Sequence, residues 1–130
     1  MAVLLVRDGS EHWGELKAVL EAQSLRVSDV RRFSEAAECL TGPVLPLMVF
    51  TPVLLADGDW ERVLLLGKQA NVPVIVVSTC LDVRFCLDVL EKGAFDFIVP
   101  PFEYDDVAYV VRNAGWRAAP GAPWLASRAA

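Results

Sequence analysis

The polar residues with the clearest potential for chemistry lie at or just after the ends of apolar runs that predict strands. Asp8, Thr51 and Ser78 each hold such a position. In parallel α/β sheets, ligands bind at the edge where the carboxyl ends of the strands meet, so any site is expected there. Thr51 and Ser78 could together bind an anion. Ordinary hydrogen bonds to the backbone are the simpler interpretation, and we favour it.

The other reactive groups are scattered along the chain. His12 is the only histidine, and no pair of nucleophile and base is visible, so we do not expect an enzyme. The three cysteines, Cys39, Cys80 and Cys86, form no CxxC pair, which argues against a zinc site. We therefore expect three buried thiols in a reducing cytoplasm and no bound metal.

Strand and helix patterns alternate five times along the chain. Ser10 and Ser34 are predicted helix caps, Gly93 is a predicted left-handed helix terminator, and 53–58 is a predicted loop. The alternation predicts an α/β fold with a five-stranded parallel sheet, helices on both faces and the flavodoxin-like strand order 2-1-3-4-5. The predicted strands are 2–6, 25–30, 45–50, 74–77 and 95–99, and the predicted helices are 11–22, 34–40, 59–70, 82–92 and 103–114.

Length and composition limit the class of protein. The chain has 130 residues, 55% of them hydrophobic, which suits one compact domain at 1–116. The Ala- and Pro-rich segment 117–130 is expected to be a flexible tail. The net charge of −5 argues against a nucleic-acid partner. No apolar run is long enough for a signal peptide or a membrane span, so we expect a cytoplasmic protein without a membrane partner.

One segment carries a resemblance to a known family. Residues 72–103 read VPVIVVSTCLDVRFCLDVLEKGAFDFIVPPFE: a strand ending in a hydroxyl residue, a helix ending in Gly-Ala, and an aromatic strand followed by Pro-Phe. This resembles the second half of a response-regulator receiver domain of the CheY-like superfamily. The most specific part is 90–97, and the resemblance extends over nearly all of 2–115. It implies the receiver fold and a role in bacterial two-component phosphorelay signalling.

The same resemblance implies where a phosphorylation pocket would lie. In receiver domains, two neighbouring acids, an acceptor aspartate, a hydroxyl residue and a lysine form that pocket. The matching positions here are Arg7, Asp8, Thr51, Ser78 and Pro100. Thr51 stands at the acceptor position and Pro100 at the lysine position, so only Asp8 and Ser78 are retained. The resemblance therefore implies a degenerate pseudo-receiver without the phosphoacceptor aspartate.

These replacements remove several chemical requirements together. A threonine hydroxyl needs a base or a metal for activation, whereas a carboxylate is already ionised at neutral pH. One carboxylate beside Arg7 is a poor magnesium site, and Pro100 supplies no charge for a phosphoryl group. We therefore expect no cofactor, no Mg²⁺ and no phosphotransfer. Arg7 either pairs with Asp8 or Glu11 at the surface, which we favour, or occupies the vacated cation position.

Output in the resembled family uses the face formed by the fourth helix, the fifth strand and the fifth helix. Ser78 and Phe97 match its switch positions. On the predicted helix 82–92, a core stripe at Val83, Leu87 and Leu90 is expected.

The same helix has apolar residues beyond this stripe. Phe85 and Val89, together with Tyr109 on the last helix, form a candidate partner surface. A rotated helix would instead bury Phe85 and Val89, and the sequence does not decide between the two arrangements.

The predicted function is a non-enzymatic, phosphorylation-independent interaction or regulatory module. Its expected partner is a histidine kinase, another regulator or an output protein, and a homodimer through the output face is a candidate. The alternative is a sensor that binds a small ligand or an anion in the degenerate pocket.

Overall fold

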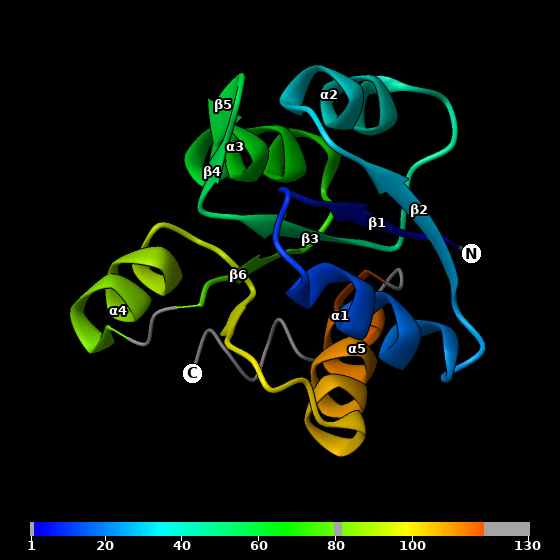
Figure 1. Cartoon of the computed structure of the whole chain (residues 1–130). Coiled ribbons are helices and arrows are strands. Elements are labelled where there is room, and N and C mark those ends of the chain that lie inside the picture. The colour runs from blue at the N-terminus through cyan, green and yellow to red at the C-terminus, as the bar shows by residue number, and fades with distance from the viewer. Residues whose placement is uncertain (1, 80–81, 119–130) are drawn as a thin grey trace.

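A computed structural model describes residues 2–79 and 82–118 of the chain (Figure 1). Its main sheet has five parallel strands in the order β2-β1-β3-β6-β7, which confirms the predicted flavodoxin-like order. The strands are β1 (Ala2–Val6), β2 (Arg26–Val30), β3 (Met48–Pro52), β6 (Val74–Val77) and β7 (Asp96–Ile98).

Helices cover both faces of this sheet. In Figure 1, α1 and α5 lie on one side of it, and α2 and α3 lie on the other. Two separate apolar clusters result, one shared by the sheet with α1 and α5, the other shared with α2, α3 and α4. The helices are α1 (His12–Glu21), α2 (Phe33–Thr41), α3 (Trp60–Ala70), α4 (Val83–Glu91) and α5 (Tyr104–Ala118).

The burial of each strand follows from its place in the sheet. The central strands β3 and β6 are buried along their whole length, which agrees with their continuous apolar sequences. Leu5, Phe50 and Ile75 lie side by side in register and contribute to the cluster under α1 and α5. The edge strand β2 is mostly exposed, which matches its mixture of apolar and polar residues.

The predicted serine caps are wrong. Helix α1 begins after Glu11 and α2 begins after Arg32, and neither of these residues makes a side-chain capping bond. The backbone N–H of Ser10 instead donates to Asp8 Oδ1 at 2.8 Å. Ser34 lies inside α2 as its second residue.

A short hairpin replaces the loop predicted before α3. At its tip, the Asp57 carboxylate accepts hydrogen bonds from the backbone N–H groups of Phe33 (2.7 Å) and Ser34 (3.0 Å). Asp57 therefore caps α2 from a distant part of the chain, in place of the predicted local serine. The hairpin strands are β4 (Leu54–Leu55) and β5 (Gly58–Asp59).

Helix α4 is rotated relative to the prediction. Val89 is fully buried and Phe85 is half-buried, whereas Val83, Leu87 and Leu90 are exposed. The expected core stripe therefore faces outward, and the two α4 residues proposed for a partner surface face inward.

Aromatic packing accounts for this rotation. The ring of Phe85 lies edge-on to Trp60 and Phe97, with centroid distances of 5.8 and 5.9 Å, so it joins α4 to α3 and β7. The Asp82 carboxylate caps the helix by accepting from backbone N–H groups of the first turn. Gly93, with a φ of 107°, follows the helix in the left-handed region, as predicted.

The last helix is longer than expected. It continues to Ala118, beyond the predicted helix end at 114 and the predicted domain boundary at 116. The remainder of the predicted tail, and Cys80, lie outside the described residues. Cys39 and Cys86 are half-buried free thiols. Among the helices of the described residues, none has the length and apolar character needed to cross a membrane.

Candidate functional site

A cavity of about 200 Å³ lies at the carboxyl ends of the central strands. The sequence predicted a site at this edge of the sheet, which is where β1, β3 and β6 end. Polar and apolar side chains share the wall, which is lined by Asp8, Ser10, His12, Trp13, Pro52, Val53, Leu54, Val77, Ser78, Thr79 and Pro100.

Three of the five residues predicted for this pocket line the cavity. They are Asp8, Ser78 and Pro100, which come from the ends of three different strands. Arg7 and Thr51 are not part of the wall. The fold therefore brings together only part of the predicted constellation.

Thr51 is turned into the protein. Its side chain is fully buried, and its Oγ1 donates a hydrogen bond to the carbonyl oxygen of Pro52 at 3.1 Å. Pro52 and Val53 form the cavity wall at the end of β3. The hydroxyl at the resembled acceptor position is thus used internally, and it forms no anion-binding pair with Ser78 at the wall.

Asp8 is held in place by its neighbours. Its Oδ1 accepts hydrogen bonds from the backbone N–H of Ser10 and from the indole Nε1–H of Trp13, both at 2.8 Å. Burial by itself raises the pKa of Asp8, but the hydrogen bonds from Ser10 and Trp13 and the nearby His12 outweigh burial and lower the pKa. The carboxylate is therefore ionised at neutral pH and fixed in position.

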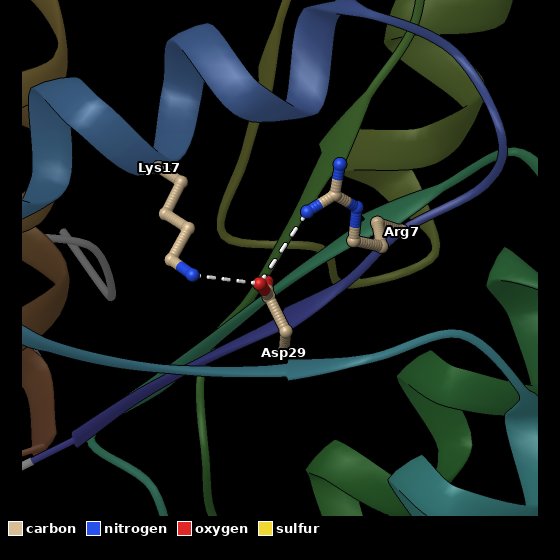
Figure 2. Close-up of polar contacts among 3 residues, drawn as sticks. All are labelled: Arg7, Lys17 and Asp29. Atoms are coloured by element: carbon tan, nitrogen blue, oxygen red, sulfur yellow. Dashed lines mark hydrogen bonds and ion pairs between the residues drawn. The ribbon is translucent and has the colours of Figure 1, made fainter.

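Arg7 lies outside the cavity and points toward β2 (Figure 2). Its Nη1 is 3.4 Å from Asp29 Oδ2, and the Nζ of Lys17 lies 3.0 Å from the same oxygen. Among the described residues, the buried Nε of Arg7 has no hydrogen-bond partner. Neither predicted arrangement is present, because Asp29 replaces Asp8 or Glu11 as the ion-pair partner and the guanidinium does not occupy a cation position in the cavity.

The wall does not fit the magnesium ion of the resembled family. Of the described residues, Asp8 alone supplies a carboxylate to the wall, and one oxygen of that carboxylate already accepts two hydrogen bonds. Within 2–79 and 82–118, no group of three or more His, Cys, Asp or Glu side chains is arranged to hold a metal ion. Magnesium requires a nearly octahedral set of oxygen ligands, and the wall offers too few.

Sequence reasoning missed several residues of the wall. His12 and Trp13 come from the first turn of α1, Thr79 follows β6, and Leu54 comes from the hairpin. The position of Thr79 at the end of a buried strand was an available signal. The hairpin offered none, because strands of two residues have no measurable periodicity.

The residues at the predicted switch positions lie on β7 and directly after the neighbouring strand β6. The backbone N–H of Ser78 donates to the carbonyl oxygen of Ile98 at 3.0 Å. Phe97 is buried, and its ring packs against Phe85. A switching role for Ser78 and Phe97 stays a prediction.

A second candidate site is the α4–β7–α5 face, which we define by Val83, Leu87, Leu90 and Tyr109. These side chains are 66%, 55%, 38% and 61% exposed. The three α4 residues lie opposite Phe85, which faces α3. The exposed apolar stripe of Val83, Leu87 and Leu90 along one side of α4 is the kind of feature that marks a contact surface. A groove of about 190 Å³ adjoins β7 and α5, lined by Ile98, Val99, Pro101, Phe102, Glu103, Asp106, Val107 and Val110.

The chain is similar in sequence to known sensory transduction and regulatory proteins. No family model matches it. Over 120 residues it is 30% identical to the sensory transduction protein LytT of Bacillus cereus. This match covers 87% of this chain and 46% of LytT. Over 121 residues it is 27% identical to the swarming motility regulation protein RssB of Serratia marcescens. This match covers 92% of this chain and 55% of RssB. The chain thus spans about half the length of these curated relatives.

Solved structures give a similar result. The signal receiver domain of a signal transduction histidine kinase from Syntrophus aciditrophicus matches with a TM-score of 0.72 and 28% identity, over 88% of this chain and 89% of that chain. A response regulator receiver domain protein from Clostridium thermocellum matches with a TM-score of 0.75 and 21% identity, over 90% and 96% of the two chains, and supports the fold alone.

The fold and the cavity define the broad class, a doubly wound α/β domain with its candidate site at the carboxyl ends of the strands. The relatives and the structural neighbours support a narrower description, the receiver domain of two-component signalling. Receiver domains and response regulators are signalling modules and not classical enzymes.

Proposed function

We propose that this receiver domain is a pseudo-receiver, which acts as a protein-interaction or regulatory module without being phosphorylated. The make-up of the cavity wall carries the proposal. Strand β3 ends at the cavity with Pro52, which Val53 follows, and among the described residues Asp8 is the only carboxylate of the wall. A phosphoryl acceptor must be an ionised or activated nucleophile, and β3 supplies none to the cavity.

The charges around the cavity give further support. Phosphoryl transfer is stabilised by cationic groups directed at the phosphoryl oxygens. Within the part of the chain that the structure describes, no lysine or arginine lines the cavity, and Pro100 stands at the position of the family's lysine. The neighbouring Arg7 is engaged with Asp29 instead.

Intact-mass spectrometry tests the loss of phosphotransfer. The protein is incubated with acetyl phosphate and Mg²⁺ beside a phosphorylatable receiver domain as a control. We expect the control to gain the mass of one phosphoryl group and this protein to keep its mass. A stoichiometric gain that maps to Asp8 or Thr51 would contradict the proposal.

We further propose that the α4–β7–α5 face makes the protein contact. From the resemblance, the partner is a histidine kinase, another regulator or an output protein, or a second copy of this chain in a homodimer. The exposed apolar stripe at Val83, Leu87 and Leu90 supports this face, because its burial in a complex would be favourable. A cytoplasmic location and the absence of a nucleic-acid partner remain parts of the proposal.

Sedimentation of two matched variants tests the homodimer. Leu87 lies on the α4–β7–α5 face, and Leu65 is equally apolar and similarly exposed, at 57%, but lies on α3. We expect the wild type and Leu65→Glu to dimerise with rising concentration and Leu87→Glu to stay monomeric. A wild type that is monomeric at every concentration, or a Leu65→Glu variant that loses the dimer equally, would contradict the homodimer.

A sensor for a small ligand is the second candidate function. The cavity at the strand ends, with the hydroxyl residues Ser10, Ser78 and Thr79 in its wall, favours it. A ligand that stabilises the protein in a thermal-shift screen, and that requires Asp8, would support the sensor.

A further inference from the structure

The helix N-termini at the cavity edge are already occupied by the protein's own carboxylates. In a parallel α/β domain these positive helix ends gather at the carboxyl edge of the sheet, where they commonly attract anions. Asp57 binds the first N–H groups of α2, Asp59 accepts from the third residue of α3 at 3.1 Å, and Asp82 caps α4. Three of the five helix ends therefore carry an internal anion.

The other two helices add negative charge to the same edge. Asp8 lies beside the start of α1, where it accepts the hydrogen bonds of Ser10 and Trp13. Helix α5 carries Asp105 and Asp106 in its first turn. An incoming anion would thus meet helix ends that are already neutralised and a fixed carboxylate at the cavity wall.

The cavity itself favours positive charge. Its wall contains the ionised Asp8 and the hydroxyl residues Ser10, Ser78 and Thr79, and no lysine or arginine of residues 2–79 and 82–118 lines it. Hydroxyl oxygens accept hydrogen bonds as readily as they donate them. The imidazole of His12 also lines the cavity. The remaining lining residues are apolar and suit the methylene groups next to a charged head: Trp13, Pro52, Val53, Leu54, Val77 and Pro100.

We propose that this cavity binds an organic cation, the ammonium or guanidinium head group of an alkylamine or alkylguanidine. A volume of about 200 Å³ suits a head group with a short stem and is below the range of pockets that enclose drug-sized ligands. The head group comes from a free small molecule or from a lysine or arginine side chain of a partner. The inference is independent of phosphorylation and of the α4–β7–α5 face, since neither contributes to the charge of the wall.

Amide NMR spectra recorded during titration test the inference. The probes are agmatine as a free guanidine, N-acetyl-arginine amide as a peptide-like guanidine, inorganic phosphate as an anion, and Mg²⁺ alone. We expect saturable shifts of the Ser10, Ser78 and Thr79 amides with the guanidines only. Tighter binding of agmatine points to a free ligand, and tighter binding of the arginine amide points to a partner side chain.

Two pairs of variants link the binding to the cavity. Asp8→Asn removes the wall charge and is expected to weaken guanidine binding at least about tenfold, whereas Asp105→Asn, on the exposed first turn of α5, leaves binding unchanged. Pro100→Lys places a tethered ammonium at the wall and is expected to block binding. Pro100→Ala removes the ring without adding charge and keeps it.

Two results would contradict binding of an organic cation in the cavity. Saturation by phosphate or Mg²⁺ but by neither guanidine would overturn the inference, and so would guanidine binding that Pro100→Lys leaves intact. If Asp8→Asn does not fold, the Pro100 pair decides alone. A mass gain in the phosphotransfer experiment would contradict the pseudo-receiver and leave this test unaffected.

Discussion

The carboxyl edge of the sheet and the α4–β7–α5 face differ in how far their side chains are satisfied within the domain. At the edge, the side chains of Asp57, Asp82 and Thr51 form hydrogen bonds with backbone groups of the protein itself. On the face, Val83 and Leu87 remain exposed although they are apolar. The comparison teaches that polar groups at the strand ends can be satisfied within the domain while apolar groups on an outer surface stay available for contact.

The largest effect is expected from Thr51→Asp, which tries to restore an acceptor at the edge. The Thr51 side chain is fully buried and faces away from the cavity, so the new carboxylate would lack solvent and a partner. We expect a loss of about 3 kcal/mol or more in the free energy of unfolding, measured by urea denaturation, and no phosphorylation.

Thr51→Val is the matched control for that variant. It keeps the shape of the side chain and removes the hydroxyl, so only the hydrogen bond to the Pro52 carbonyl is lost. We expect a cost of about 1 kcal/mol. A Thr51→Asp protein as stable as Thr51→Val and phosphorylated by acetyl phosphate would break the comparison, because the edge would then still be a working site.

The two sides of α4 provide the next test. Phe85→Ala removes the ring between Trp60 and Phe97 and should cost about 2–4 kcal/mol in the free energy of unfolding. Leu87→Ala on the opposite side should change it by less than about 0.5 kcal/mol in the monomer. Equal losses from the two variants, measured by chemical denaturation, would show that the outer stripe is part of the core.

A smaller effect is expected at the hairpin. Asp57→Ala removes the carboxylate that accepts from the N-terminus of α2, so the melting temperature should fall by about 4 °C. Glu38→Ala, at an exposed position within the same helix, should shift it less. Identical melting temperatures for wild type and Asp57→Ala in differential scanning calorimetry would show that the cap contributes nothing.

The smallest effect is expected in how the stability difference between wild type and Asp57→Ala changes at acid pH. Hydrogen bonds from the backbone of Phe33 and Ser34 lower the pKa of Asp57 below its ordinary value of 3.8. A carboxyl group with a lowered folded-state pKa stabilises the fold above the unfolded pKa, and this contribution is lost as the pH falls through the folded pKa. Wild type should therefore lose its advantage over Asp57→Ala below about pH 3.8, in melting curves recorded from pH 6 to pH 2.

Much of the fold was predictable because burial leaves a strong mark on long elements. The continuous apolar runs of β3 and β6 identified central strands, and the alternation of elements fixed the parallel order. The cap of α2 was not predictable, because its partner Asp57 lies 23 and 24 residues away from the N–H groups that it binds. Contacts over such a separation have no local sequence pattern.

The candidate site was predictable in position more than in composition. Asp8, Ser78 and Pro100 reached the cavity because they end or follow strands that meet at one edge. Thr51 did not, since the alternation of side chains along a strand turns every second residue to the other face. On α4, apolar residues surround most of the helix, so only the packing of Phe85 against Trp60 decides which side faces inward.

The two edges of the sheet also determine how copies of this chain can meet. Strand β2 carries Arg26 and Asp29 on an exposed edge, and β7, at the opposite edge, is only three residues long. Charge on one edge and shortness of the other are the usual protections against strand addition and aggregation. Self-association of this chain should therefore be reversible and mediated by helices, without extension of the sheet from one molecule into the next.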